Sequence, residues 1–441
     1  MNRRPVPNPK DFDSTLRFRE TKYWYVCGPE VIKKQGWKIY ISANPNNFAD
    51  ILASVKNLLV ECNLHFKYIR TINSLRKLNT GNFGYSQIGK SIVLYLPKPK
   101  DDMVQQLMGI LNEYRDECPV VPFAESFGND LPLYYRYGAY KGFTIELDNL
   151  KKGDDRTDYD VAIPKGIKDP FAAIRLDEIN RSDFNKFLLY YPSFESITQQ
   201  GKCGIFGAMD MRSKSFREVI LKVGYPNGQV QADGRDGSDF IRRELYFYNA
   251  MSQRGITYLA PELVDSYDEG RDVALVLERL NGKSLLQHLL NGSLLSAHLE
   301  ACWDIITQIH ENGLYLGDAK LANFLLNEDD KKVFVIDFET SGVIEAGDTV
   351  PIRTFDIQLP IDKDVRLFDC MHFLASVLFD YSTGQYEIED RRINLTTLCE
   401  KDPESSTQRW AITRLREVLS ANDLVFAQKG THIDKQKRPS K

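Results

Sequence analysis

The sequence predicts an α+β protein, in which a mixed N-terminal domain is followed by a unit with two lobes. From Trp24 to about Tyr140, short apolar strands alternate with stretches in which apolar residues recur at helical spacing. After a charged segment, the chain is first rich in strands and then, from Ser284 onward, mainly helical. A strand-rich half followed by a helical half indicates two lobes.

These changes in composition predict four segments. Residues 1–150 form the first domain, and residues 151–185, rich in charge and poor in apolar side chains, form a linker. Residues 186–430 form the two-lobed unit. Residues 431–441 are polar and basic and are expected to form a tail.

The expected elements follow one another along the chain. Helices of the first domain are predicted over residues 48–63 and 103–114. Its strands are predicted over residues 38–42, 65–70, 91–97 and 131–140. Strands of the second unit are predicted over residues 205–210, 217–224 and 273–280.

Composition restricts the class of protein. With 441 residues, 42% hydrophobic and 11% aromatic, the chain has enough apolar material for sizeable cores. A net charge of -4 argues against a generally basic protein that binds nucleic acid or a membrane surface. No signal peptide and no run of about 18 apolar residues is present, so we expect a cytoplasmic protein. The seven cysteines form no CxxC pair, which argues against a disulfide framework or a zinc site.

The stretch GLYLGDAKLANFLLNEDDKKVFVIDFE, residues 313–339, carries groups suited to phosphoryl transfer. That chemistry needs an aspartate to accept the proton of the attacking hydroxyl, and oxygen ligands for magnesium. Asp318 fits the base and Lys320 a cation near the transferred group, while Asn323 and Asp337 fit the metal ligands. The pattern resembles the catalytic core of protein kinases, which reads D-x-K-x-x-N and then D-F-G.

Upstream residues occur in the order that such a core requires. Lys222 in VILKVG lies on an apolar strand and fits a nucleotide-binding lysine, and Glu244, on a predicted helix, can pair with it. The segment QQGKCGIFG offers Gly201, Gly204 and Gly207 as a loose glycine-rich loop. A hairpin turn explains these glycines equally well. The prediction of a kinase-like fold therefore rests on the whole series of residues occurring in the expected order.

The strand GWKIYIS separates two kinds of side chain. Alternation places Trp37, Ile39 and Ile41 on one face, and Lys38 and Tyr40 on the other. The polar face either meets water or carries out chemistry.

Cations recur on the polar sides of the first domain's strands: Lys38, Lys67, Arg70, Lys90 and Arg136. Each of them alone is explained by exposure to water. If they converge, they form a pocket for a dianion such as phosphate. A lysine that is desolvated among other cations has a lowered pKa and can serve as a general base.

Together these motifs resemble the class III lanthipeptide synthetases. The order is QGWK, FK, GK and YRYG in the first domain, then VILKVG and VIDFE in the second unit. The resemblance implies an N-terminal domain like the phosphothreonine lyases, followed by a bilobal protein-kinase-like domain. The kinase would phosphorylate serine or threonine of a precursor peptide, and the lyase would eliminate phosphate to give dehydroalanine or dehydrobutyrine.

The resemblance also implies roles for individual residues. Lys67 matches the lysine that removes the α-proton, and Lys38 matches the one that stabilises the enolate. Arg70, Lys90 and Arg136 match the cationic phosphate cradle.

The sequence departs from the family pattern in both domains. The family strand reads K-x-H, with the histidine as general acid, whereas this chain has Tyr40. Tyr40 is one candidate donor, and His65, two residues before Lys67 and on the same strand face, is another. The third alternative is slow or lost elimination. In the kinase loop, Leu316-Gly317 replaces the usual His-Arg, and the missing arginine removes the anchor for a phosphorylated activation loop, which predicts a constitutively active kinase. Glu339 replaces the glycine of the metal motif, as in a pseudokinase, but Asp318, Asn323, Asp337 and Lys222 are all present, which favours activity.

The sequence therefore predicts a bifunctional peptide dehydratase that uses ATP, or another nucleoside triphosphate, and Mg²⁺. One alternative is an active kinase whose first domain only binds phosphopeptide, and another is a non-catalytic peptide scaffold. The implied partners are a ribosomally made precursor peptide with a leader, a cyclase domain or protein, and optionally a second copy of the chain. Family members usually continue into a cyclase domain, so we expect either a truncated chain or a natural two-domain form. Nucleic acid and membrane are not expected partners.

Overall fold

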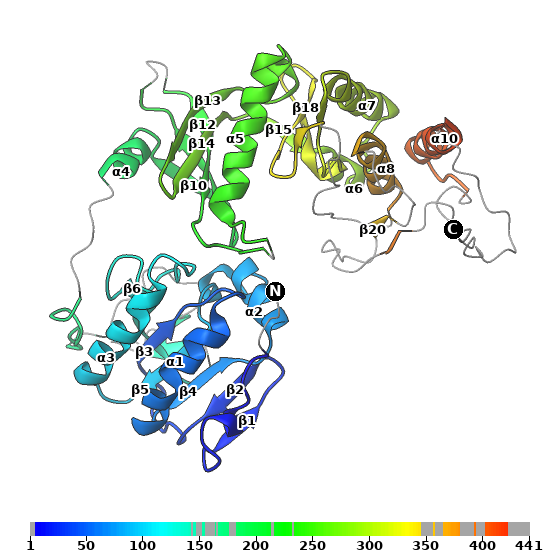
Figure 1. Ribbon diagram of the computed structural model, residues 1–441. Helices are drawn as coiled ribbons and strands as arrows, with labels where there is room; N and C mark the ends of the chain where they lie inside the picture. Colours follow the sequence, from blue (N-terminus) through cyan, green and yellow to red (C-terminus); the bar gives the residue numbers. More distant parts are fainter. Residues whose placement is uncertain are drawn as a thin grey trace, which may run out of the picture. The chain divides into compact units, whose positions relative to one another are not determined.

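The structure is a computed structural model of the chain. It describes residues 5–142, 144–146, 152–154, 164, 166–175, 182–212, 216–231, 233–344, 356–357, 365–379, 392–393 and 402–421. The predicted tail, 431–441, lies outside the described residues. Helices and sheets are both present (Figure 1), which confirms the α+β class.

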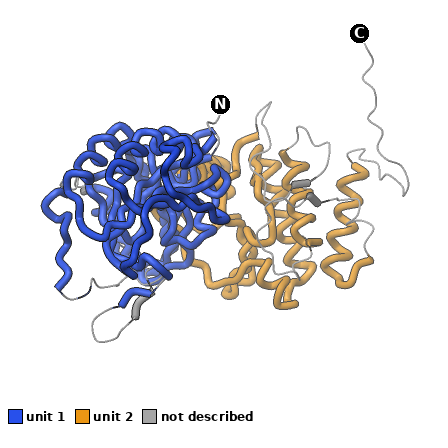
Figure 2. Tube along the Cα trace, turned by 90° about the horizontal axis from the view of Figure 1, so that it is seen from below, with its two compact units in different colours: residues 1–241, 266–276 blue, residues 242–265, 277–441 orange. Residues whose placement is uncertain are grey.

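The chain divides into two compact units (Figure 2). Unit 1 comprises residues 1–241 and 266–276, and unit 2 comprises residues 242–265 and 277–441. Unit 1 thus contains the predicted first domain together with strands of the following sheet. Among the described residues, no helix combines the length and apolar character needed to span a bilayer.

The first domain is built on a seven-stranded sheet with the order β1-β2-β4-β5-β3-β7-β6. Its strands are β1 (Phe18–Glu20), β2 (Trp24–Cys27), β3 (Gln35–Ile41), β4 (His65–Ile69), β5 (Ile92–Leu96), β6 (Glu125–Ser126) and β7 (Leu133–Ala139). Every neighbouring pair is antiparallel. Strands far apart in the sequence are therefore brought side by side, and their register decides which side chains meet.

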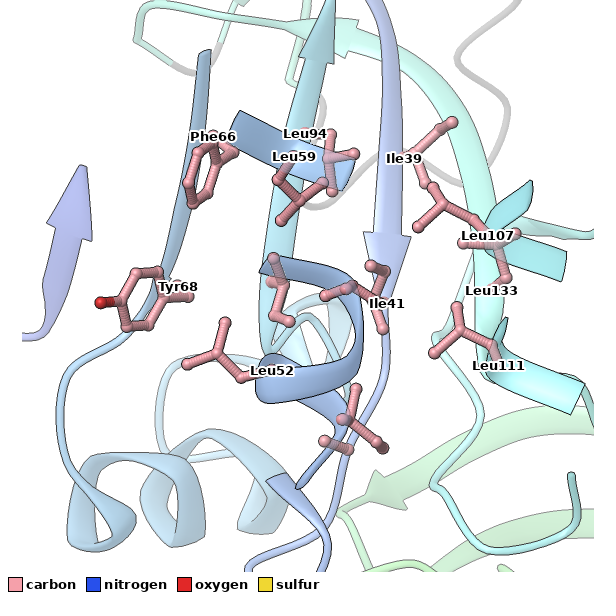
Figure 3. Close-up of a cluster of buried hydrophobic side chains, with 14 of the residues drawn as sticks. Ile39, Ile41, Leu52, Leu59, Phe66, Tyr68, Leu94, Leu107, Leu111 and Leu133 are labelled. Carbon is pink, nitrogen blue, oxygen red and sulfur yellow. The ribbon is translucent and has the colours of Figure 1, made fainter. Parts of the chain in front are cut away.

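Helices cover one face of this sheet. They are α1 (Phe48–Glu61), α2 (Ile72–Thr80) and α3 (Asp101–Leu111). The apolar residues of α1 recur at helical spacing and pack on Ile39, Ile41 and Phe66 of the sheet (Figure 3). After α1 the chain turns at Asn63, whose φ of 49° is the left-handed conformation that ends many helices.

The core of the first domain continues past its predicted end at residue 150. Phe171, inside the predicted linker, is fully buried against Trp37, Phe127 and Tyr135. The hydroxyl of Tyr135 donates to the Asp169 carboxylate at 2.7 Å. The short strands β8 (Thr144–Glu146) and β9 (Lys152–Asp154) also pair across that boundary.

A second sheet follows, with the strand order β10-β11-β12-β14-β13. Its strands are β10 (Ser193–Gln199), β11 (Cys203–Met209), β12 (Glu218–Gly224), β13 (Leu263–Glu269) and β14 (Asp272–Glu278). Two helices belong to this part of the chain, α4 (Ser182–Leu189) and α5 (Gly237–Gln253).

The remaining residues are mainly helical but include short strands. The helices are α6 (Leu285–Leu290), α7 (Ser296–Glu311), α8 (Val365–Leu378) and α10 (Ser406–Ala421). The strands are β15 (Gly282–Ser284), β16 (Leu314–Tyr315), β17 (Phe324–Asn327), β18 (Val333–Val335), β19 (Gly342–Val343), β20 (Asp356–Ile357) and β21 (Arg392–Ile393). A capping box at Ser284, closed by Gln287, starts α6.

Candidate active sites

The first candidate site is the loop between β16 and β17 in unit 2. The carboxylate of Asp318 is mostly buried, and Lys320 Nζ lies 2.5 Å from its Oδ2 atom. Asn323 Nδ2 donates to the Asp318 carbonyl at 2.9 Å and to Oδ2 at 3.2 Å. The structure thus brings Asp318, Lys320 and Asn323 together, with the Asp318 carboxylate held in one orientation.

Asp337 lies beside this loop because β17 and β18 pair. Phe324 is opposite Val335, and the N–H of Ile336 donates to the Asn323 carbonyl at 2.9 Å. Asp337 itself has φ 68°, a conformation uncommon for a residue other than glycine and found preferentially at functional sites.

The two predicted magnesium ligands fit the chemistry of that ion. The amide nitrogen of Asn323 is engaged with Asp318, which leaves its oxygen for a ligand, and Asp337 adds a carboxylate. The described residues hold no group of three or more His, Cys, Asp or Glu side chains that could bind a metal. Magnesium is commonly held by one or two carboxylates, with water and substrate phosphates as the other ligands.

Helix α8 supplies residues that the motif analysis missed. The carboxylate of Asp369, fully buried, accepts from the N–H groups of Leu316 and Gly317, both at 2.7 Å. His310 Nε2 lies 3.0 Å from the same carboxylate. One turn and two turns further along, α8 carries His372 and Ser376. These residues could have been found in the sequence, because polar side chains at helical spacing interrupt the apolar run FDCMHFLASVLF.

His372 and Ser376 both contact the loop around Asp318. His372 Nδ1 lies 3.7 Å from Asp318 Oδ1, and Ser376 Oγ accepts from the N–H of Leu321 at 3.0 Å. Burial lowers the pKa of His372 to about 4, with Asp318 raising it and Lys320 lowering it. The imidazole beside Asp318 is therefore neutral at pH 7.

The backbone conformation at Gly317 gives a reason for glycine at this position, where the kinase pattern has arginine. Its φ of 75° is strained for any residue with a Cβ, and its N–H is one of those bound by Asp369. The carbonyl of Leu316 accepts from the hydroxyls of Thr340 and Ser341 at 3.1 and 2.9 Å. The segment that follows Asp337 thus fixes the residue pair that replaces His-Arg.

The predicted nucleotide-binding residues lie on the expected elements. Lys222 is buried on β12 opposite Ile205, and Glu244 is fully buried on α5. Lys222 belongs to unit 1 and Glu244 to unit 2. Their roles stay predictions.

The three glycines have different surroundings. The N–H of Gly201, in the turn between β10 and β11, donates to the carbonyl of Thr80 at 3.2 Å. A Cβ at Gly201 would lie 1.7 Å from the Asn79 carbonyl oxygen, so this close approach requires glycine. Gly204 and Gly207 lie on β11 rather than in a loop. The N–H of Gly201 is therefore engaged within unit 1.

The second candidate site is the sheet face that the helices of the first domain leave uncovered. Lys67 is opposite Val93 of β5, and Val93 is opposite Tyr40 of β3. Two residues before Tyr40 on β3, and so on the same face, Lys38 is opposite both Tyr95 of β5 and Arg136 of β7. Residues directly opposite one another share a face, so the register brings Lys38, Tyr40, Lys67 and Arg136 to the same side.

The centre of this face is buried, whereas Lys67 and Arg136 are only partly buried. Lys38, Tyr40 and Lys90 are 8%, 2% and 5% exposed, under a small cluster that includes Val31 and Val121. The ammonium groups of Lys90 and Lys38 lie 4.6 and 5.9 Å from the centre of the Tyr40 ring. The Tyr40 hydroxyl is buried and has no hydrogen-bond partner among the described residues.

Lys67 and Arg70 lie in different environments. The ammonium group of Lys67 lies 4.3 Å from the centre of the Trp24 ring. Arg70 follows the end of β4, lies 3.3 Å from the Glu20 carboxylate and donates to the Thr21 carbonyl. The structure therefore pairs Arg70 with β1 and shows no contact between it and the other four cations among the described residues.

His65 lines a pocket of about 350 Å³ on the same sheet face. Its ring lies 5.0 Å from that of Tyr95. Burial lowers the pKa of His65, and the charges of Arg19 and Lys67 lower it further, against a backbone hydrogen bond at Pro29 and the charge of Glu30. A neutral imidazole is thus favoured.

Comparison with known proteins finds similarity to the first domain and to a longer part of the chain. Residues 7–173 match the family described as "RamC, N-terminal domain". The chain is also 26% identical over 347 residues to a "Probable SapB synthase" from Streptomyces coelicolor, which covers 71% of this chain. The chain spans about a third, 36%, of that relative's length. Both matches support the coarse form of the resemblance, that of a lanthipeptide-synthetase-like protein.

Proposed function

We propose that the chain is a bifunctional dehydratase, which phosphorylates serine or threonine in a lanthipeptide precursor and then eliminates the phosphate. The observation that carries the proposal is the sheet face where Lys38, Tyr40, Lys67 and Arg136 share two adjacent rows, in a region that matches the RamC N-terminal domain. The loop around Asp318 supplies the phosphorylation that such a lyase needs.

In the kinase reaction, the hydroxyl oxygen of the peptide residue attacks the γ-phosphorus of ATP while Asp318 accepts the hydroxyl proton. The bond between the γ-phosphorus and the bridging oxygen breaks, and its electrons leave with ADP. Lys320, 2.5 Å from Asp318, lies close enough to balance charge on the transferred group. Asn323 and Asp337 would hold magnesium, which neutralises phosphate charge when it is bound. Lys222 and Glu244 serve nucleotide binding in this proposal.

In the lyase reaction, neutral Lys67 takes the α-proton of the phosphorylated residue. The electron pair forms the carbon–carbon double bond, the carbon–oxygen bond breaks, and its electrons leave with phosphate. Lys38 stabilises the negative charge that develops on the carbonyl oxygen, and Lys90 and Arg136 bind the phosphoryl group. The products are a dehydroamino acid and inorganic phosphate.

We assign the proton donor for the leaving phosphate to Tyr40. Its hydroxyl is buried without a partner, in the row that contains Lys67. His65 is less suited, because burial lowers its pKa and so disfavours the cationic form that is the better proton donor.

The test is the intact mass of a Ser/Thr-rich precursor peptide after incubation with the chain, ATP and Mg²⁺. A loss of one water per modified residue is expected. Lys67→Met should instead give a gain of one phosphate per residue, because the kinase still acts. Lys98→Gln, an exposed lysine after β5, is the control and should behave as wild type.

The same assay separates the rival functions. If the wild-type chain only adds phosphate, the first domain binds phosphopeptide without eliminating it. If neither wild type nor Asp337→Asn changes the peptide or turns over ATP, the chain acts as a scaffold and the proposal fails.

A further inference from the structure

The pocket beside His65 contains cations that the proposed reaction does not use. Arg17 and Arg19 line it, together with Glu30, Lys141 and Tyr95. Neither the Arg17 nor the Arg19 guanidinium group has a hydrogen bond or ion pair to any of the described residues, although the backbone of both residues pairs with the neighbouring segment of the chain. The Glu30 carboxylate is already engaged, since Lys141 Nζ lies 3.1 Å from it.

Sheet register connects this pocket to the lyase face. Arg19 of β1 is opposite Val26 of β2, and Val26 is opposite Lys67 of β4. Arg19 and Lys67 are therefore in one row of one face, two strand spacings or about 10 Å apart. Arg17 lies beside Gly28, whose N–H donates to its carbonyl at 2.9 Å, at the next row.

The local field in the pocket favours an anion. Lys141 lowers the pKa of Glu30, and Arg19 and His65 contribute to the same effect. The charges of Arg19 and Lys67 lower the pKa of His65. After Glu30 and Lys141 neutralise each other, two guanidinium groups remain, and guanidinium matches carboxylate and phosphate geometry.

We propose that Arg17 and Arg19 bind an anionic side chain of the peptide substrate, separate from the phosphoryl group on which Lys67 acts. An extended peptide advances about 3.3 Å per residue, so a span of about 10 Å places this anion three residues from the reacting residue. The ligand is a carboxylate or a second phosphorylated residue. This inference rests on the proposed lyase function.

The test is direct binding, measured by calorimetry with the full chain carrying Lys67→Met, which cannot eliminate. Peptides carry phosphoserine at the reacting position and either Glu or Gln three residues before or after it. We expect one Glu peptide to bind about fivefold more tightly than its Gln partner. Arg17→Gln/Arg19→Gln should abolish that difference without changing the affinity for the Gln peptide.

Two results would overturn the inference. Equal affinity for the Glu and Gln peptides at both positions would show that the pocket recognises no flanking anion. Parallel weakening of both peptides by the Arg17→Gln/Arg19→Gln pair would assign the pocket to the reacting phosphoryl group instead. The control Lys10→Gln/Lys98→Gln removes two exposed charges elsewhere on the domain and should change neither affinity.

A third peptide identifies the source of the anion. This peptide carries phosphoserine in place of the flanking Glu. It should bind more tightly than the Glu peptide if the pocket takes a second phosphorylated residue, and no more tightly than the Glu peptide if the pocket takes a carboxylate. Dehydration by the wild-type chain is followed separately by mass, so failure of the lyase proposal and failure of this inference give different results.

Discussion

The two candidate sites are built in opposite ways. In unit 2, Asp318, Lys320 and Asn323 lie within six residues of one another and are joined by hydrogen bonds of 2.5 to 3.2 Å. In the first domain, Lys38, Lys67 and Arg136 come from three strands and are brought together by sheet register.

The difference shows how each site is kept in place. The kinase-like loop is held by polar anchors, above all the buried carboxylate of Asp369, so its geometry depends on a few hydrogen bonds. The lyase-like face is held by an apolar core on its reverse side, so its geometry depends on packing. Single polar substitutions should therefore affect the two sites differently.

The largest effect is expected for Asp318→Asn, because the amide cannot accept the proton of the attacking hydroxyl. Phosphorylation, followed as phosphopeptide formed per minute in the Lys67→Met background, should fall about 10³-fold. Asp402→Asn, an exposed aspartate, is the matched control. A fall of less than tenfold would contradict the assignment of Asp318 as base.

Acid should destabilise unit 2 through His372. Its pKa in the folded chain is about 4, below the unfolded value of 6.5. At pH values between 4 and 6.5, the unfolded chain therefore binds more protons than the folded chain does. Stability therefore falls as pH decreases from 6.5 to 4, by about 3 kcal/mol at about 1.4 kcal/mol per pKa unit. Urea unfolding followed by circular dichroism should show this loss for wild type and a smaller loss for His372→Gln. Parallel losses in the two proteins would remove His372 as the cause.

Asp369→Asn tests the anchor of the loop without adding or removing bulk. The Asn side chain has one acceptor oxygen, whereas the two oxygens of Asp369 accept from the N–H groups of Leu316 and Gly317 and contact His310. The loop should therefore shift and misplace Asp318. We expect kcat for phosphorylation to fall about 10²-fold with little change in KM for ATP. A rise in KM with kcat unchanged would indicate that Asp369 acts on nucleotide binding instead.

The smallest effect on stability, and the sharpest contrast, is expected for Tyr40→Phe. Removing a buried hydroxyl without a partner should leave the urea midpoint unchanged or raise stability by about 1 kcal/mol, while elimination falls about 10²-fold. The control is Tyr68→Phe, whose hydroxyl donates to the Pro7 carbonyl at 2.9 Å. It should cost about 1 kcal/mol and leave elimination intact. Unchanged elimination in Tyr40→Phe would reassign the proton donor.

Sequence reasoning succeeded where the determinants are local. Alternation predicted that Ile39 and Ile41 lie on one face of their strand, and Lys38 and Tyr40 on the other. In the structure, Ile39 and Ile41 belong to the core that the helices cover, and Lys38 and Tyr40 lie on the other face of the sheet. The spacing from Asp318 to Asn323 was enough to predict a compact polar loop, and the pairing of β17 with β18 brings Asp337 beside it.

Long-range contacts had no local signal. Asp369 is more than fifty residues from the loop it holds, and its carboxylate appeared in the sequence as one polar residue in an apolar helix. Arg70 looked equivalent to the other cations, but its pairing with Glu20 depends on where β1 lies in the sheet. Arg19 became relevant because β1 and β2 place it in the row of Lys67, and Arg17 because it lies at the next row.

By itself, the sequence determined the α+β class, the alternation of each strand and the polar loop around Asp318, because propensity and periodicity act over a few neighbouring residues. The tertiary structure decided which cations share a face, that Lys38, Tyr40 and Lys90 are buried there, and that the Tyr40 hydroxyl has no hydrogen-bond partner in the described part of the chain. The physical reason is strand register: each pairing joins residues far apart in the chain, and a shift of one residue would turn every side chain to the opposite face.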